Sequence, residues 1–304
     1  MVKKKIFDCM MFHKELDLLK LRVETLKDHV DMFVVSCGDR VHLTGEKIEP
    51  FVETDEFRKF AANSGVDIRP FVVELSDDKS NNGNWIREKG ARVAILDHLK
   101  EINKEYPIDP EALILISDTD EIPNPNALEE VKQYQFCSLE QMYFIHFADL
   151  FSTKCVTGTT SCKWAKLLGM ENDLGEICQW LRDHKDVFTI VENGGWHLSY
   201  VGGRDHILDK CRSIAEGNKD YTLDFIDEKI KNAVKNLSSP YSHDGIKERE
   251  LMFVDNSREE MQKFLVAQRR FTGTVEKEIE LDIMPKPVFE GRFNNLCYYN
   301  QAPF

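Results

Sequence analysis

The stretch Ala112-Leu-Ile-Leu-Ile-Ser117, followed at once by Asp118-Thr-Asp-Glu121, decides the fold prediction. An unbroken apolar run of this length is typical of a strand that is buried on both faces of a parallel sheet. We expect the carboxylates after it to emerge at the strand end, because burying unpaired charge is too costly. Open α/β sheets bind ligands at that edge. The sequence therefore predicts a functional site beside Asp118, Asp120 and Glu121.

The carboxylates themselves indicate a metal site. Oxygen ligands suit a hard divalent cation such as Mn2+ or Mg2+, which in enzymes most often faces substrate phosphates. Pro123 and Pro125 end the strand and stiffen the turn. The alternative is a solvated acidic turn that caps a helix near residues 126–130, because the D-x-D pattern alone is a weak signal.

Composition limits the class of protein. The chain has 304 residues, of which 42% are apolar and 31% charged, so we expect one large α/β domain or two small ones. A net charge of -13 argues against a nucleic-acid partner. The cysteines form no C-x-x-C pair, which indicates free thiols in a reducing compartment. No signal-peptide core and no run of about 18 apolar residues occurs, which predicts a cytoplasmic protein without a transmembrane segment.

Strands and helices are expected to alternate up to residue 117. Apolar runs predict strands at residues 5–11, 30–36, 68–74 and 112–117. Helical spacing of apolar residues predicts helices at 15–26, 57–62 and 85–106. This order indicates a parallel sheet with right-handed crossovers.

The pattern changes after residue 130. We expect one long strand at 141–151 and two short strands at 187–191 and 196–201. A charged helical stretch follows at 205–235, and the tail from residue 277 is expected to be extended.

Seven short motifs follow one another along the chain. They are F-H-K-E-L-D-L-L-K-L-R at 12–22, V-D-M-F-V-V at 30–35, L-T-G at 43–45, W-I-R-E-K-G-A-R at 85–92, S-D-T-D-E-I-P at 117–123, G-W-H-L-S at 195–199 and K-C-R-S at 210–213. S-D-T-D-E-I-P followed downstream by G-W-H-L-S is a specific combination. In these motifs and their order the chain resembles glycosyltransferase family 17 from about residue 6 to residue 216.

The resemblance implies a GT-A-type fold, in which a Rossmann-like, mostly parallel sheet is joined to a mixed acceptor-binding half. In one continuous domain, residues 1–130 would form the nucleotide-sugar-binding half and residues 131–304 the acceptor-binding half with a C-terminal extension. It also implies metal-dependent, inverting transfer of a sugar, expected to be GlcNAc, from a UDP-sugar to a glycan acceptor. Because this chain shows no membrane anchor, we expect a bacterial or virus-encoded member.

Site residues follow from the chemistry and the resemblance together. Asp118, Asp120 and His197 are the expected metal-site residues. Asp120 is the expected direct ligand and His197 a further ligand, whereas Asp118 would reach the ribose or a metal-bound water. The alternative for His197 is a histidine packed beside Trp196. Lys210 is expected to hold the diphosphate as a mobile point charge.

Other residues are candidates for the donor site or for the base. The donor-binding candidates include Arg92, which could instead pair with Glu88 at helical spacing, and Glu15, which could instead cap a helix. A general base must take the acceptor proton; Glu216 and Asp205 are the first candidates, while Glu176 and Glu192 stay open. The donor-binding candidates are Phe12, Glu15, Trp85, Arg87, Arg92, Asp118 and Lys210.

Two other functions remain open from the sequence. The same aspartates could serve a metal-dependent phosphohydrolase or nucleotidyltransferase. A non-catalytic glycan-binding protein could also use this scaffold.

Overall fold

The computed structural model describes residues 5–152, 154–174, 176–236, 251–253, 284–289 and 292–296. The first part of the chain alternates strands and helices as expected, and the bounds differ from the prediction by no more than two residues. The elements are β1 (Ile6–Phe12), α1 (Leu16–Leu26), β2 (Met32–Gly38), the 3-10 turn η1 (Phe51–Glu53), α2 (Asp55–Asn63), β3 (Ile68–Val73), α3 (Gly83–Glu105) and β4 (Leu113–Asp118).

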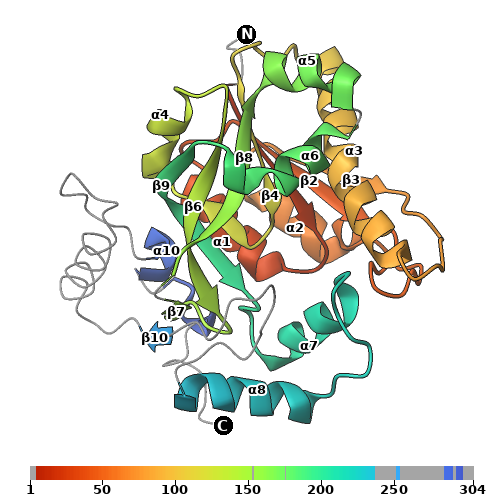
Figure 1. Ribbon diagram of the computed structural model, residues 1–304, viewed down its shortest axis with the longest axis vertical. Coiled ribbons are helices and arrows are strands. Elements are labelled where there is room, and N and C mark those ends of the chain that lie inside the picture. Colours follow the sequence, from red (N-terminus) through yellow and green to blue (C-terminus); the bar gives the residue numbers. More distant parts are fainter. Residues whose placement is uncertain are drawn as a thin grey trace.

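These four strands form a parallel unit in the order β3-β2-β1-β4. Alternate side chains of β1 enter two cores, because successive residues of a strand face opposite sides of the sheet. Met10 packs with Leu19 of α1 and Phe57 of α2, whereas Cys9 packs with Ile95 of α3. Helices therefore cover both faces (Figure 1). The strand order reverses between β1 and β4, which is where such sheets bind ligands.

The second half extends the same sheet with mixed pairing. β8 (Val156–Lys163) lies antiparallel to β4, and β6 (Phe136–Ile145) lies antiparallel to β8. β9 (Ile190–Ser199) runs parallel to β6 and also pairs with the short β5 (Glu121–Pro123). With β7 (Leu150–Ser152) and β10 (Leu251–Phe253), the described residues form a ten-stranded sheet. The predicted α/β class is confirmed, and the arrangement is consistent with a GT-A-like fold.

Two strand predictions in this half were wrong. The expected strand at 141–151 breaks at His146, whose φ of 64° lies in the left-handed region, so the chain forms β6 and β7 separately. The two short strands expected at 187–191 and 196–201 are one strand, β9. β8 was missed because its sequence, V-T-G-T-T-S-C-K, has no apolar run.

The helical prediction for 205–235 was also wrong in part. α7 (Arg204–Ser213) and α8 (Leu223–Asn236) are separate helices. Between them Gly217 packs so closely on the Cys211 carbonyl that a Cβ would lie 2.1 Å from its oxygen. Most of the expected extended tail lies outside the described residues; the part within them contains the short helices α10 (Lys286–Phe289) and η4 (Asn294–Leu296).

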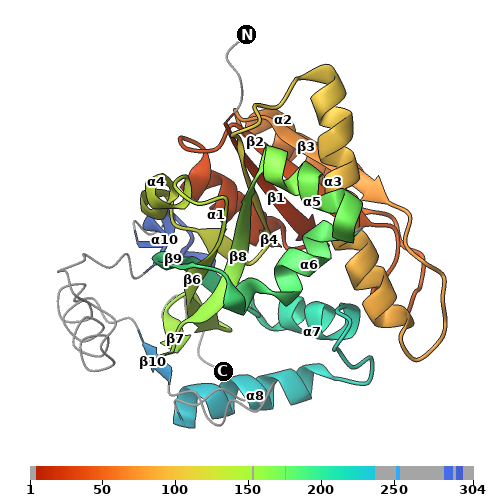
Figure 2. The same ribbon diagram turned by 45° about the horizontal axis from the view of Figure 1, so that its top comes forward.

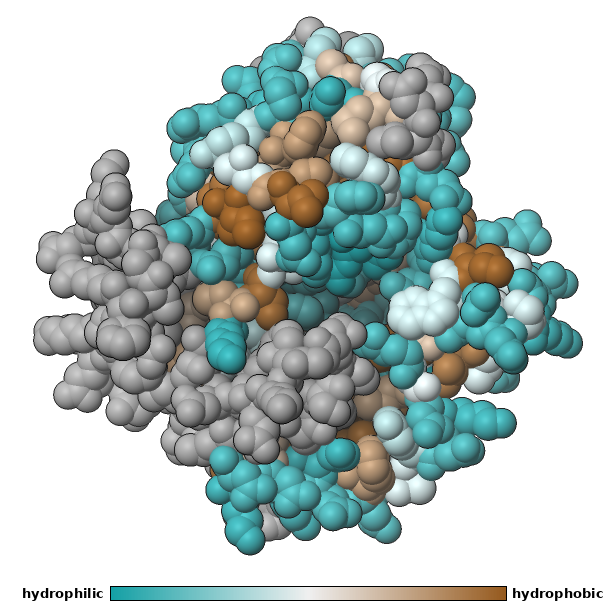
Figure 3. Space-filling view, viewed as in Figure 1, coloured by the Kyte–Doolittle hydropathy of each residue, from teal (hydrophilic) through white to brown (hydrophobic). Residues whose placement is uncertain are grey.

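The remaining helices are η2 (Pro125–Ala127), α4 (Leu128–Val131), α5 (Trp164–Leu174), α6 (Ile177–Asp183) and η3 (Lys185–Val187). Figure 2 shows α4 at the left of the molecule and α5 and α6 near its centre. Among the described residues, no helix has the length and apolar character needed to cross a membrane. Figure 3 shows hydrophobic residues in small groups among hydrophilic ones on the described part of one face.

Candidate active site

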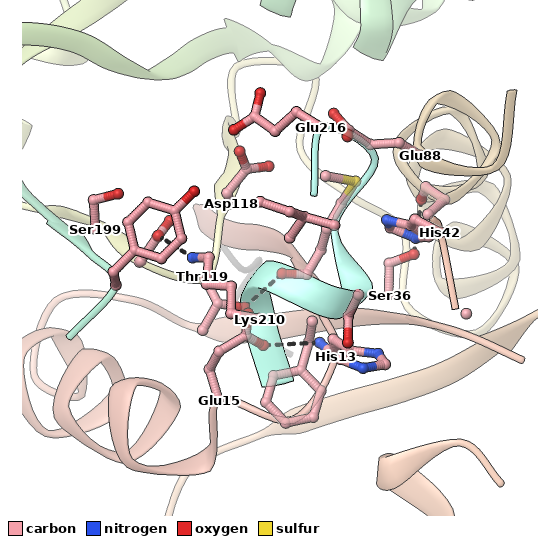
Figure 4. A pocket seen from close by; sticks show the side chains of 18 of the residues that line it. His13, Glu15, Ser36, His42, Glu88, Asp118, Thr119, Ser199, Lys210 and Glu216 are labelled. Atoms are coloured by element: carbon pink, nitrogen blue, oxygen red, sulfur yellow. Dashed lines mark hydrogen bonds and ion pairs between the residues drawn. The ribbon is translucent and has the colours of Figure 1, made fainter. Parts of the chain in front are cut away.

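A pocket lies at the carboxyl ends of β1, β2 and β4, where the strand order reverses. Both halves of the chain line it: Phe12 and Asp118 come from the parallel strands, whereas His197 comes from β9 and Lys210 from α7. Figure 4 shows labelled side chains from both halves, among them Asp118 and Lys210, directed toward one space. The lining residues with polar or aromatic side chains are Phe12, His13, Glu15, Ser36, His42, Glu88, Asp118, Thr119, Asp120, Arg182, His197, Ser199, Tyr200, Lys210, Ser213 and Glu216.

The acid turn, Asp118 to Glu121, joins β4 to β5, and its first three residues line this pocket. The expectation that its carboxylates leave the core was wrong for two of them, since Asp120 is 4% exposed and Glu121 is 0% exposed. The solvated-turn alternative fails for the same reason. Burial is possible because each of the two carboxylates has a cationic partner, Lys210 for Asp120 and Arg182 for Glu121.

Asp120 is paired with a lysine and lies close to a histidine. Its Oδ2 lies 2.6 Å from Lys210 Nζ and 3.6 Å from His197 Nε2. Burial alone would raise the pKa of Asp120, but Lys210 and His197 outweigh it and hold that pKa well below its usual range. Burial would lower the pKa of Lys210, but Asp120 and Glu15 outweigh it and raise that pKa. His197 reaches this position because it pairs with Glu121 across β9 and β5.

Asp118 is held by two arginines, one on each oxygen. Arg92 Nη2 lies 3.0 Å from Oδ1, and Arg182 Nη2 lies 3.0 Å from Oδ2. Arg182 also binds Glu121 Oε1 at 2.5 Å. Burial would raise the pKa of Asp118, but Arg182 and Arg92 outweigh it and lower that pKa. With both oxygens engaged, Asp118 is a poor metal ligand in this arrangement.

The described acids and histidines form no complete set of metal ligands. No group of three or more His, Cys, Asp or Glu side chains in the described part of the chain is arranged to hold a metal ion. Asp120 and His197 approach each other closely enough to share one, with 3.6 Å between Oδ2 and Nε2. Mg2+ and Mn2+ often take only one or two protein carboxylates and complete their shell with water and substrate phosphates. Two protein ligands of this kind could hold a cation only together with substrate oxygens, and the metal itself stays a prediction.

The structure brings some of the other predicted residues into the pocket. Phe12, Glu15, Lys210 and Glu216 line it. Glu15 Oε2 accepts hydrogen bonds from the backbone N–H groups of residues 13 and 14, so it braces the chain before α1 and makes no side-chain cap. Burial would raise the pKa of Glu15, but Lys210 and His206 outweigh it and lower that pKa.

Other predicted residues lie elsewhere. Arg87 donates to the carbonyl oxygens of His42 and Asp78, at 2.7 and 2.6 Å, and so ties two loops together. Trp85 is 49% exposed and does not line the pocket. Asp205 is exposed in the first turn of α7 and is also outside the pocket. Arg92 forms the pair with Glu88 that was the alternative to a donor-binding role, at 3.4 Å, and it also binds Asp118.

Sequence reasoning missed several lining residues, among them His13, His42, Glu88 and Arg182. Burial is the largest cause that lowers the pKa of His42 to about 4, so that ring is neutral at pH 7. Burial also lowers the pKa of His13. Burial raises the pKa of Glu88. His13 directly follows β1, so the rule that located Asp118 would have found it. Arg182 required a different signal, namely that the buried acids need a second cation.

Comparison with protein families identifies the family of this chain. The family model for glycosyltransferase family 17 matches residues 1–206. The chain belongs to glycosyltransferase family 17. The matched residues include the acid turn and His197 but end before Lys210 and Glu216. Comparison with curated proteins finds no match.

Membership makes the protein a glycosyltransferase, with a sugar donor and an acceptor. The site at the switch point of the sheet lies largely within the matched region. The expected cytoplasmic location and the bacterial or viral source stay predictions, since the family match concerns neither.

Proposed function

We propose that this family 17 glycosyltransferase is a metal-dependent, inverting enzyme that moves a sugar, with GlcNAc the first candidate, from a UDP-sugar to a glycan acceptor. The observation that carries the proposal is that His197 of β9 and Lys210 of α7 both approach Oδ2 of Asp120 in the acid turn. An acid, a histidine and a flexible cation at a ligand-binding sheet edge suit a nucleoside diphosphate.

The charge of the pocket supports a cation. Its lining contains two permanently cationic side chains, Arg182 and Lys210, against five carboxylates. A diphosphate would meet net repulsion there without an added positive charge. Bound between Asp120 and His197, a divalent cation would stabilise the negative charge that develops on the leaving diphosphate. The five carboxylates are Glu15, Glu88, Asp118, Asp120 and Glu216.

The chain's own residues would do the remaining work. Lys210 lies on a helix with its ammonium inside the pocket, so it would bind a phosphate oxygen and orient the leaving group. Glu216 would take the proton of the acceptor hydroxyl, because it lines the pocket whereas Asp205 does not. Figure 4 shows Glu216 at the end of the pocket away from Glu15. Donor and acceptor would thus enter from different ends.

The first test is a thermal-shift screen of UDP-sugars with Mn2+ and with EDTA. A ligand at 100 times its dissociation constant should add about 2.7 kcal/mol of stability. Stabilisation by one UDP-sugar that EDTA removes would support the proposal and identify the donor. The anomeric configuration of the product, measured by NMR, would then test inversion. The absence of any shift with every sugar nucleotide in the presence of Mn2+ would overturn the assignment of the donor.

A further inference from the structure

Arg22 is a fully buried charged residue that does not line the pocket. Its side chain is 0% exposed, and it lies on α1 among the buried leucines Leu18, Leu19 and Leu26. A buried arginine is tolerated only when its donors are satisfied. The partners of its guanidinium therefore show what holds it there.

One side of the guanidinium binds Asp8 of β1. Nε lies 2.7 Å from Oδ2 and Nη2 lies 2.6 Å from Oδ1, which is a bidentate pair between two side chains of 0% exposure. Nη2 also donates to Ser117 Oγ of β4 at 2.6 Å. Asp8 and Ser117 both face α1, in the same alternation as Met10 and Leu115. The guanidinium thus bridges the two strands that flank the switch point.

The other side binds the backbone of the acid turn. Nη1 donates to the carbonyl oxygens of Asp118 at 2.8 Å, Thr119 at 3.2 Å and Glu121 at 3.0 Å. One side chain therefore contacts four of the five residues from Ser117 to Glu121. No residue of the turn has a positive φ among the described backbone, so its shape does not depend on glycine.

We infer that Arg22 is the positioning residue of the acid turn. By drawing three carbonyl oxygens toward α1, it leaves the side chains of Asp118 and Asp120 facing the pocket. Asp8 of β1 holds the guanidinium of Arg22, and Arg22 of α1 in turn holds the backbone of the acid turn beside the pocket. The inference rests on the proposed function only in assigning donor and cation binding to this turn.

A lysine at position 22 cannot make all the contacts that Arg22 makes. Its ammonium is a single nitrogen with three donors, whereas the guanidinium spreads five donors over a rigid fork. Arg22→Lys keeps a cation beside Asp8 but cannot also reach three carbonyl oxygens. Arg22→Met alone would leave Asp8 buried without a partner, so the apolar variant is the pair Asp8→Leu with Arg22→Met.

The experiment measures amide hydrogen exchange of the peptide at residues 117–123 in the wild type, in Arg22→Lys and in the double variant, without ligand. We expect exchange in that peptide to become about tenfold faster or more, while peptides from α3 and β6 keep their protection. The matched control is Arg87→Lys, since Arg87 also binds backbone carbonyls at 3% exposure but in other loops. It should loosen residues 39–48 and 74–83 and leave 117–123 unchanged.

Unchanged exchange at 117–123 in both Arg22 variants would overturn the inference, and so would equal loosening throughout the sheet. A second readout is turnover of the donor that the screen identifies. We expect Arg22→Lys to lower kcat by up to roughly 100-fold from misplaced groups, with the acceptor KM little changed. If the wild type binds no UDP-sugar, the proposed function fails, while the exchange result still decides the role of Arg22.

Discussion

Lys210 Nζ lies 2.6 Å from Asp120 Oδ2, and the two side chains are only 13% and 5% exposed. An ammonium therefore lies at the carboxylate that is proposed to receive a divalent cation. His197 Nε2 lies 3.6 Å from the same oxygen. A cation entering this site has to compete with Lys210, and a diphosphate that attracts the ammonium would assist it. Donor and cation should consequently bind with positive coupling.

Lys210→Met should have opposite effects on the two ligands. Mn2+ alone should bind about tenfold more tightly, because the competing ammonium is gone. UDP in the presence of Mn2+ should bind less tightly by about the same factor, because the point charge on the diphosphate is lost. Isothermal titration of Mn2+ with and without UDP measures both. Lys14→Met is the control, since Lys14 forms a half-exposed pair with Asp209. Weaker Mn2+ binding by Lys210→Met would contradict the competition.

Asp120→Ala should abolish Mn2+-dependent UDP binding. The fold should persist, but at a cost, because the substitution leaves Lys210 buried without its main partner. Breaking such a pair costs roughly 3–5 kcal/mol. Urea unfolding should show that loss, and adding Lys210→Met to Asp120→Ala should recover part of it. Normal turnover by Asp120→Ala would disprove the metal assignment.

Glu216→Gln should lower kcat by about 100-fold or more without weakening the donor, because only the proton acceptor is removed. The measurement is steady-state transfer, with UDP affinity determined in parallel. Asp205→Asn is the discriminating variant, as its carboxylate lies outside the pocket. A loss of kcat in Asp205→Asn with none in Glu216→Gln would move the base to Asp205.

The parallel half of the fold was predictable because its signals are local. β4 is an apolar run, and α1 and α3 show helical spacing, so burial and periodicity agreed with the final structure. β8 was not predictable from such signals, since its threonines and serines are buried by neighbouring strands rather than by their own hydrophobicity. The pairing of β8 with β4 and β6 makes this segment a strand, and that pairing is a tertiary contact.

The candidate site was predictable in its acids but not in its cations. Asp118 and Asp120 were predicted because they lie at the end of an apolar run that indicates a buried strand. Lys210 and His197 were predicted from the family motifs. Arg182 and Arg22 were missed because their helices also carry exposed charged residues, such as Asp17 in α1 and Asp183 in α6. The sequence alone therefore does not show which charged side chains are paired in the interior. The number of buried carboxylates was the missing information, because it depends on how β5 and β9 close over the turn.

Gly195→Ala should impair the site through the backbone. Gly195 has φ 148°, and a Cβ there would lie 2.1 Å from the carbonyl oxygen of Ile122. The pairing of β9 with β5 must then shift, and His197 moves with it. We expect lower stability and weaker Mn2+ binding, measured by urea unfolding and titration. Gly169→Ala in α5 is the control, because nothing lies within 4 Å of its Cβ and alanine favours a helix by up to about 1 kcal/mol.

His146 should make the protein sensitive to mild acid. Its ring is 0% exposed, and burial lowers its pKa to about 3, against about 6.5 in an unfolded chain. Between these values the unfolded state binds more protons than the folded state, so stability falls as pH falls below about 6.5. At pH 5 this single group should cost about 2 kcal/mol relative to its neutral form at higher pH.

The test compares urea unfolding of the wild type and His146→Asn at pH 7.5 and pH 5. Asparagine tolerates the left-handed backbone at this position, so the substitution removes the titrating ring without adding backbone strain. The wild type should lose about 2 kcal/mol more than the variant on acidification. Equal losses would show that His146 takes up its proton in the folded state as readily as in the unfolded chain. A larger loss in the variant would reverse the sign and require a carboxylate partner that holds the ring charged.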